Sequence, residues 1–350
     1  MSTSVAIVGV GMSSPLGLDA RQSAFVLRAR KLAPAGTSFP DRRGHAVGDA
    51  RSRRLDDALI GGPRLLDLAA PALAEAARGL LGPSAPLPLF LALPSRRAEA
   101  EQPLGPDFLA ELGRRASVPL ALEHTEAFAL GHASFAAALA RAVESVASRA
   151  YPFALVGGVD SHHDPAVLAA LDEERRLQAE GAWDGFIPSE AAAFLLVGPV
   201  EARALRAEPA RAAASAGPAY ARVTAVATAL EPEPDAESPV IGEAATEVVR
   251  RVAAALTPPL SWVLPDVNGE RHRIKEWTFV RMRNREHFDD DRTVETRLYD
   301  ELGDVGAASG AVHAVWACVA FRAGFAPARE ALVSLASEGP LRGAFALEAA

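Results

Sequence analysis

Few side chains in this sequence are of the types that carry out chemistry, and their spacing is the first guide to function. The single cysteine, Cys318, excludes an intramolecular disulfide and a zinc site built on cysteines. It lies in an apolar stretch and is predicted to be a small core residue. His162 and His163, followed by Asp164, have the residue types of a metal site. Adjacent side chains point apart and this turn is expected to be solvated, so we predict no metal ion there.

A second candidate motif stands near the N-terminus, where Gly9-Val10-Gly11 follows an apolar strand. Such a turn can open a dinucleotide-binding unit when a third glycine starts a helix. Here Ser14 occupies the position of the third glycine, and the Pro15 that follows it does not start a helix well. We therefore predict no nucleotide cofactor, and no other cofactor.

The composition is that of a globular protein: 350 residues, 49% hydrophobic and 23% charged, with a net charge of −8. The acidic balance argues against nucleic acid as a partner. Since no uninterrupted apolar run approaches the ~18 residues of a membrane helix, we expect no membrane segment. The N-terminus has no basic region and reads as a buried strand and a turn rather than a signal peptide. We expect a cytoplasmic protein.

Apolar segments recur in the same order in two halves of the chain, residues 1–200 and 218–350. Each half is predicted to run strand, helix, strand, helix and two closing strands. The segments are 4–8, 64–80, 89–93, 132–149, 153–156 and 194–197, and then 221–227, 241–256, 262–267, 306–321, 331–335 and 343–347. Residues 201–217 are predicted to be a surface connection. Alternating strands and helices, with fully apolar strands, indicate α/β layers with both sheet faces covered.

Four strings within these segments resemble β-ketoacyl synthases, and they occur in that family's order. They are VAIVGVGMSSPLG (5–17), ALVGGVDS (154–161), DGFIPSEAAAFLLVG (184–198) and LGDVGAASGAVHAVWACVAFRAG (302–324). The resemblance spans nearly the whole chain. It implies an α/β protein of the thiolase-like fold, with two duplicated halves in a five-layer αβαβα arrangement.

The resemblance also implies where a catalytic site would lie. A condensing synthase uses a cysteine at the start of a buried helix, where the helix N-terminus favours the thiolate. It further uses two histidines and a lysine. The matching positions here are His132 for the cysteine, Asn268 and Asp304 for the histidines, and Tyr299 for the lysine. A slip in register brings Ser134 forward as the candidate nucleophile, but never a thiol. We therefore predict that the chain does not catalyse Claisen condensation.

Two interpretations of these substituted positions remain open. His132 and Asp304, with Asn268 as a donor to a carbonyl, have the residue types of a general-base site for hydrolysis or acyl transfer. Alternatively, the polar side chains fill the space of a lost site and satisfy one another. Because every matched position is substituted, the sequence favours loss of the site.

A basic stretch, 271–277, is predicted to be a solvated loop beside the mouth of the pocket, or a docking site for an acidic carrier protein. The leading functional hypothesis is a non-condensing binding or scaffold subunit, either chain-length-factor-like or an adaptor such as a secretion-associated one. Expected partners are a second copy or a related synthase, and an acyl carrier protein or acyl thioester. The alternative is an acyltransferase or thioester hydrolase that uses His132, Asp304 and Asn268.

Overall fold

The computed structural model describes residues 5–30, 35–78, 85–97, 104–105, 107–179, 184–200, 218–232 and 241–350. Its main sheet has ten strands in the order β10-β9-β11-β12-β8-β1-β7-β6-β4-β5. The strands of this sheet are β1 (Val5–Ser13), β4 (Leu89–Ala92), β5 (Glu126–Phe128), β6 (Ala154–Ser161), β7 (Glu190–Pro199), β8 (Ala221–Leu230), β9 (Trp262–Pro265), β10 (Val294–Glu295), β11 (Glu330–Ala336) and β12 (Leu341–Ala349). A separate pair is formed by β2 (Ala35–Pro40) and β3 (Ala46–Asp49).

The two halves of the sheet have equivalent strand orders, counted outward from the contact between β1 and β8. Outward from β1 lie β7, β6, β4 and β5, and outward from β8 lie β12, β11, β9 and β10. In each half the two inner pairings are antiparallel and the two outer pairings are parallel. This equivalence confirms the predicted duplication. The exact division at 1–200 and 218–350 stays a prediction, and the expected connection, 201–217, lies outside the described residues.

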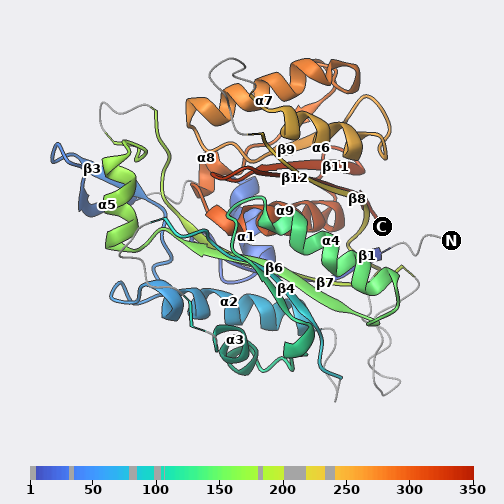
Figure 1. The fold of residues 1–350 in the computed structure, drawn as a ribbon, viewed down its shortest axis with the longest axis horizontal. Helices are drawn as coiled ribbons and strands as arrows, with labels where there is room; N and C mark the ends of the chain where they lie inside the picture. Colours follow the sequence, from blue (N-terminus) through green and yellow to red (C-terminus); the bar gives the residue numbers. More distant parts are fainter. Residues whose placement is uncertain are drawn as a thin grey trace.

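Helices separate and cover the two halves of the sheet, giving the five predicted layers (Figure 1). One outer layer holds α2 (Gly61–Ala77) and α3 (Phe108–Ala116), and the other holds α6 (Glu243–Ala253) and α7 (Arg271–Arg283). The middle layer contains α1 (Ala20–Arg28), α4 (Ser134–Ala147) and α9 (Ser309–Ala323). Of two further helices, α5 (Pro165–Glu173) follows β6 and α8 (Tyr299–Leu302) precedes α9.

Helix α9 is buried on every side through its first twelve residues, Ser309 to Ala320. A helix that is apolar all round belongs in a core rather than at a surface. Small residues allow its neighbours to approach closely, because a Cβ on Gly310 would lie 2.7 Å from the Cβ of Phe135 in α4. The two central helices share one core cluster with both halves of the sheet. The start of α9 is therefore held rigidly at the centre of the molecule.

The predicted segments of both halves all correspond to observed helices or strands, but the prediction for residues 271–277 is wrong. Residues 271–277 form the first part of helix α7 instead of a solvated loop. Arg273 and Trp277 are buried there. Trp277 packs into the cluster beneath α6, and its indole donates to Glu295 at 2.9 Å. No helix in the described part of the chain is long and apolar enough to cross a membrane.

Candidate functional site

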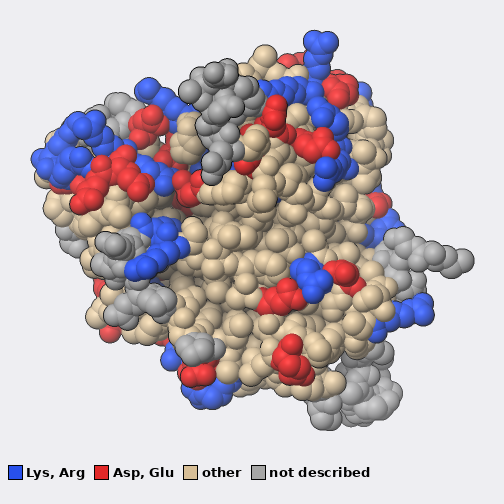
Figure 2. All heavy atoms as spheres, in the orientation of Figure 1, with Lys and Arg blue, Asp and Glu red and all other residues tan. Residues whose placement is uncertain are grey.

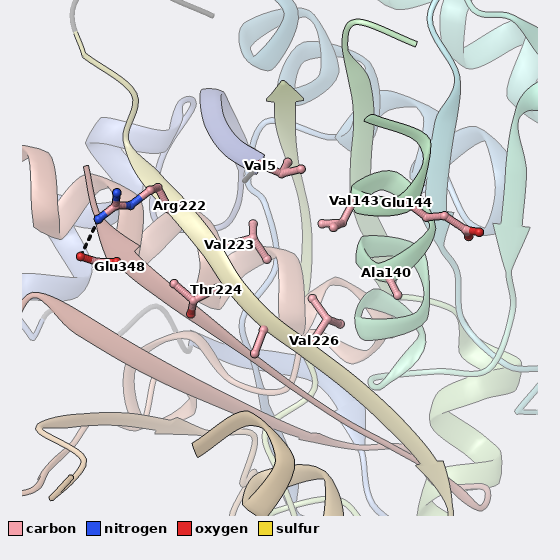
Figure 3. A pocket seen from close by; sticks show the side chains of 10 residues that line it. Val5, Ala140, Val143, Glu144, Arg222, Val223, Thr224, Val226 and Glu348 are labelled. Carbon is pink, nitrogen blue, oxygen red and sulfur yellow. Dashed lines mark hydrogen bonds and ion pairs between the residues drawn. The ribbon is translucent and has the colours of Figure 1, made fainter. Parts of the chain in front are cut away.

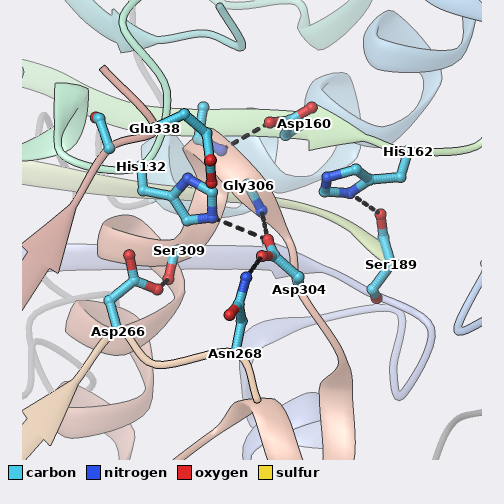
Figure 4. Close-up of polar contacts among 12 residues, drawn as sticks. His132, Asp160, His162, Ser189, Asp266, Asn268, Asp304, Gly306, Ser309 and Glu338 are labelled. Carbon is cyan, nitrogen blue, oxygen red and sulfur yellow. Dashed lines mark hydrogen bonds and ion pairs between the residues drawn. The ribbon is translucent and has the colours of Figure 1, made fainter. Parts of the chain in front are cut away.

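Three of the predicted site residues meet at the carboxylate of Asp304 (Figure 4). His132 Nε2 lies 2.9 Å from Asp304 Oδ1, and Asn268 Nδ2 donates to Oδ2 at 2.5 Å. The backbone N–H of Gly306 also donates to Oδ1, at 2.7 Å. His132, Asn268 and Asp304 are all buried. The expected convergence of these positions is therefore seen in the structure, while their functional roles stay a proposal.

Each of these side chains is positioned by the end of a different element. His132 lies two residues before the start of α4, after Gly131, whose φ of +80° turns the chain towards the site. Asn268 follows β9. Asp304 lies between α8 and α9, and its backbone is fixed by two bonds to the loop before β7: Ser189 N–H to Asp304 O at 2.9 Å and Asp304 N–H to Ile187 O at 2.8 Å.

The electrostatics of the pair favour a charged carboxylate beside a histidine that binds a proton readily. Burial by itself would lower the pKa of His132, but the neighbouring Asp304 carboxylate outweighs it, and the pKa is raised. Burial would likewise raise the pKa of Asp304, yet the charge of His132 and their hydrogen bond hold it well below the usual range. Below the raised pKa of His132 the two groups form a buried ion pair with extra hydrogen bonds.

The other ring nitrogen of His132 faces a second charged group. Arg273 Nη2 lies 3.5 Å from His132 Nδ1, which is long for a hydrogen bond but places the guanidinium directly before this nitrogen. Arg273 is buried, pairs with Glu338, and donates to the backbone O of Ala336 at 2.7 Å. Neither ring nitrogen is therefore open to a substrate: in the neutral ring the Nδ1 lone pair faces Arg273, and the protonated ring has no free lone pair.

Further ion pairs close the site on the side of Asn268. Glu270 accepts from Asn268 Nδ2 at 3.0 Å and from both Nε and Nη2 of Arg176, at 2.7 and 2.8 Å. Arg176 also reaches Glu338 at 2.9 Å, so one carboxylate binds both arginines. Four cavities among the described residues lie elsewhere, since their linings do not include His132, Asn268 or Asp304.

The turn before α9 is held by a second carboxylate that the sequence did not indicate. Asp160, at the end of β6, accepts from Ala307 N–H at 2.7 Å and pairs with Arg97. Backbone N–H groups at such a turn are the usual donors to a reaction oxyanion. Here Gly306 donates to Asp304 and Ala307 to Asp160, so both donors are already bound within the protein.

Ser134 and Tyr299 lie apart from this hydrogen-bond network. The buried Ser134 hydroxyl accepts from Leu130 N–H at 2.9 Å, and within the described residues it has no bond to His132. Tyr299 is half-buried at the start of α8, and burial raises the pKa of its phenol. Its hydroxyl packs against Gly269, where a Cβ would lie 2.5 Å away. The structure thus gives Ser134 a local structural contact and Tyr299 a packing contact.

The prediction that the turn after β6 is solvated is wrong for the first of its two histidines. His162 is buried, its Nδ1 lies 3.1 Å from Ser189 O, and burial, with Arg97 nearby, lowers its pKa to about 4. His163 instead faces the backbone O of Asp57 at 3.1 Å. Asp164 caps α5 by accepting from Ala166 N–H at 2.8 Å. The described residues contain no cluster of three or more metal-binding side chains.

Cys318 is fully buried within α9, as predicted, and burial raises the pKa of its thiol far above the ordinary value. A thiolate nucleophile at this position is therefore excluded on physical grounds.

Comparisons with known proteins separate fold from sequence. No protein-family model matches the chain, and no curated protein sequence does. Solved structures match over its whole length. A chain from a complex described as a type II polyketide synthase acyl-carrier protein with its ketosynthase bound to the hexaketide matches with a TM-score of 0.76 and 14% identity, covering 100% of both chains. The chain has a ketosynthase fold.

Two further ketosynthases show the same relation. The ketosynthase from module 6 of the bacillaene synthase of Bacillus subtilis has a TM-score of 0.75 and 14% identity, over 99% of this chain and 72% of that one. An oxazolomycin ketosynthase domain from Streptomyces albus has a TM-score of 0.73 and 16% identity, over 99% and 74%. The thiolase-like ketosynthase fold expected from the sequence is confirmed, while identities this low establish the fold alone.

Proposed function

We propose that this ketosynthase-like protein is a non-condensing subunit that binds or scaffolds a partner, chain-length-factor-like or as an adaptor. One observation carries the proposal: neither ring nitrogen of His132 is open to a substrate, because Nε2 is bound by Asp304 and Nδ1 is faced by the guanidinium of Arg273. A general base or nucleophile needs a lone pair that can reach the substrate. The occupied turn N–H groups support the same conclusion.

Acyl transfer or thioester hydrolysis is the second candidate, and the His132–Asp304 contact at 2.9 Å favours it. A carboxylate that orients a histidine and raises its pKa is a frequent part of hydrolytic sites. For this activity Arg273 would have to leave Nδ1, which breaks its contacts with Glu338 and Ala336. The scaffold function requires no such rearrangement.

Intact-protein mass spectrometry after incubation with acyl-CoA and acyl-carrier thioesters tests the two candidates. We expect no acyl adduct and no thioester turnover, in the unmodified protein or in His132→Ala. His163→Ala is the matched control, because His163 contacts the backbone of Asp57 outside the site. A stoichiometric adduct, or turnover, that His163→Ala retains and His132→Ala loses would replace the scaffold proposal with acyl transfer.

We further propose that the partner, a second copy or a related synthase, packs on the face that carries α4 and β5. Figure 2 shows an uncharged area at the centre of this face, beside a small group of charged side chains. A cavity of about 600 Å³ lies between α4 and β8 on it, lined by Val143, Val223 and Val226 among others (Figure 3). The cores of protein–protein interfaces are depleted of charged residues. An acyl carrier protein is a further proposed partner, in keeping with the carrier complex among the structural neighbours.

The edge strand β5 supplies backbone groups for such a contact, since it is the last strand of the sheet and pairs only with β4 among the described strands. Phe128 O accepts from Leu93 N–H at 2.9 Å, on the β4 side. Alternation along a strand then directs the N–H and C=O of Ala127 away from β4. A partner strand can pair with these groups.

Ala127→Pro removes this outward N–H without removing a bond to β4, so we expect it to weaken self-association or synthase binding at least roughly tenfold. Ala127→Val, which keeps the N–H, is the control and is expected to assemble normally. Light scattering after size-exclusion chromatography, alone and with a candidate synthase, measures the effect. Equal assembly of the two variants would exclude β5 from the interface.

A further inference from the structure

A second pocket, of about 320 Å³, lies between α1 and α9, far from the His132 site. Its α9 side is formed by Val319, Arg322 and Ala323, whereas the candidate site surrounds the start of that helix at Ser309. The helix rises 1.5 Å per residue, so the two sites are about 15 Å apart along its axis. Small-molecule sites begin at about this size, roughly 300 Å³.

The walls of this pocket are apolar and aromatic. Val10 of β1, Val319 of α9 and the rings of Phe25 and Tyr220 line it. Phe25 packs edge-on against Phe325, with ring centroids 5.7 Å apart, which fixes one wall. A pocket of this kind accommodates an apolar body, either an aromatic ring or a short branched chain.

Two guanidinium groups stand at the pocket without a carboxylate partner among the described residues. Arg21 lies over the ring of Phe25, its carbon CZ 5.7 Å from the centroid. Arg322 lies over the ring of Tyr220 at 4.0 Å and donates to the backbone O of Pro218 at 2.8 Å. Neither arginine forms an ion pair within the described part of the chain, whereas most arginines near the His132 site do. Guanidinium groups held beside aromatic rings are well placed to bind a carboxylate.

The one acidic residue of the pocket, Glu75 of α2, is bound by the backbone. Its carboxylate accepts from Met12 N–H at 3.0 Å and from Ala20 N–H at 3.1 Å. Burial raises the pKa of Glu75, although these two hydrogen bonds oppose the effect. With two guanidinium groups against one carboxylate, the pocket has a positive balance.

From the pocket between α1 and α9 we infer a binding site for a small monocarboxylic acid with an aromatic or branched apolar body. The carboxylate binds between Arg21 and Arg322, and the apolar body packs against Phe25, Val319 and Val10. This site goes beyond the scaffold function, because it involves neither the His132 pocket nor the α4 face.

Binding of phenylacetate, measured by ligand-observed NMR and calorimetry on the full chain, tests the inference. We expect a dissociation constant in roughly the millimolar range, and much weaker binding of neutral phenylacetamide. Arg21→Gln should weaken phenylacetate binding roughly tenfold, the effect of losing a charge-assisted hydrogen bond. Arg28→Gln is the matched control, because Arg28 is on the same helix but lies over Phe325, outside the pocket lining.

Arg21 is exposed at the surface of α1, so its replacement should not impair folding. Binding that is lost in Arg21→Gln and kept in Arg28→Gln supports the site. Three results would overturn it: no binding of phenylacetate, equal binding of the acid and its amide, or equal effects of the two arginine substitutions.

Discussion

Asp304→Asn should lower the free energy of unfolding by about 3 kcal/mol near pH 6, the usual cost of removing one partner from a buried ion pair. The substitution keeps the size of the side chain but removes its charge. It also replaces one carboxylate oxygen, which is an acceptor, with an NH₂ group, which is a donor. If Oδ1 is replaced, this donor faces His132 Nε2 and Gly306 N–H; if Oδ2 is replaced, it faces Asn268 Nδ2. All three groups donate to Asp304. Buried donors left unpaired are costly.

The effect should also depend on pH, and the two pKa shifts give the direction. The depressed pKa of Asp304 stabilises the fold above the unfolded value near 4, and this contribution is lost as the pH falls through the folded pKa. The raised pKa of His132 stabilises the fold below the unfolded value near 6.5, and this contribution is lost as the pH rises through the folded pKa. The difference between unmodified protein and variant is therefore largest between about pH 4 and 6.5.

Urea unfolding at a series of pH values measures this difference. His162, whose pKa is lowered to about 4, destabilises the fold on acidification in both proteins, so the comparison rather than the raw curve carries the information. Asp300→Asn serves as the control, because Asp300 is exposed on α8 and forms no ion pair with another described residue. A difference that is small, or constant from pH 4 to 9, would show that the His132–Asp304 contact does not stabilise the fold.

The general architecture and the meeting of His132, Asn268 and Asp304 could be predicted from the sequence. Short apolar strands alternate with helices in both halves, and glycine-containing strings fix the ends of β6 and the start of α9. Because the ends of strands and helices converge in this fold, placing each string in order was enough to place the side chains. Local pattern and overall topology agree at these positions.

The charged network around the site could not be predicted in the same way. In α7 the buried residues include Arg273 and Glu276, while the apolar Ile274 is exposed. Apolar periodicity predicts that Ile274 is buried and Arg273 exposed, which is the reverse of the observed burial. Arg273 is buried because its partners, His132 and Glu338, come from distant parts of the chain. Such pairing leaves no local signal in the sequence.

The same limit applies to Arg64 in α2, which is fully buried against Glu190 of β7 at 2.6 Å. The pattern of α2 indicates an amphipathic helix but not an arginine in its buried face. The two residues are 126 positions apart, and the packing of α2 against β7 brings them together. Long-range ion pairs thus account for most of what the sequence did not reveal.

Gly306→Ala should be among the most destabilising single substitutions in the chain, because two effects combine at this position. Gly306 has a φ of +55°, and a Cβ there would lie 1.9 Å from Asp160 Oδ2. The left-handed conformation alone costs an alanine about 1–2 kcal/mol. Displacing Asp160 would also break its pairing with Arg97 and its bond from Ala307 N–H, adding about 2 kcal/mol or more.

Gly324→Ala separates these two effects, because Gly324 ends α9 with a φ of +72° and a Cβ there meets nothing within 4 Å. Conformational strain should be similar in the two variants, so the excess loss in Gly306→Ala measures the clash. Combining Gly306→Ala with Asp160→Ala should make the two substitutions less than additive, since the oxygen that clashes is gone. Urea unfolding of the four variants gives the coupling energy. Equal losses for Gly306→Ala and Gly324→Ala would mean that the turn yields to a methyl group, and that the carboxylates of Asp160 and Asp304 do not hold the start of α9 rigidly.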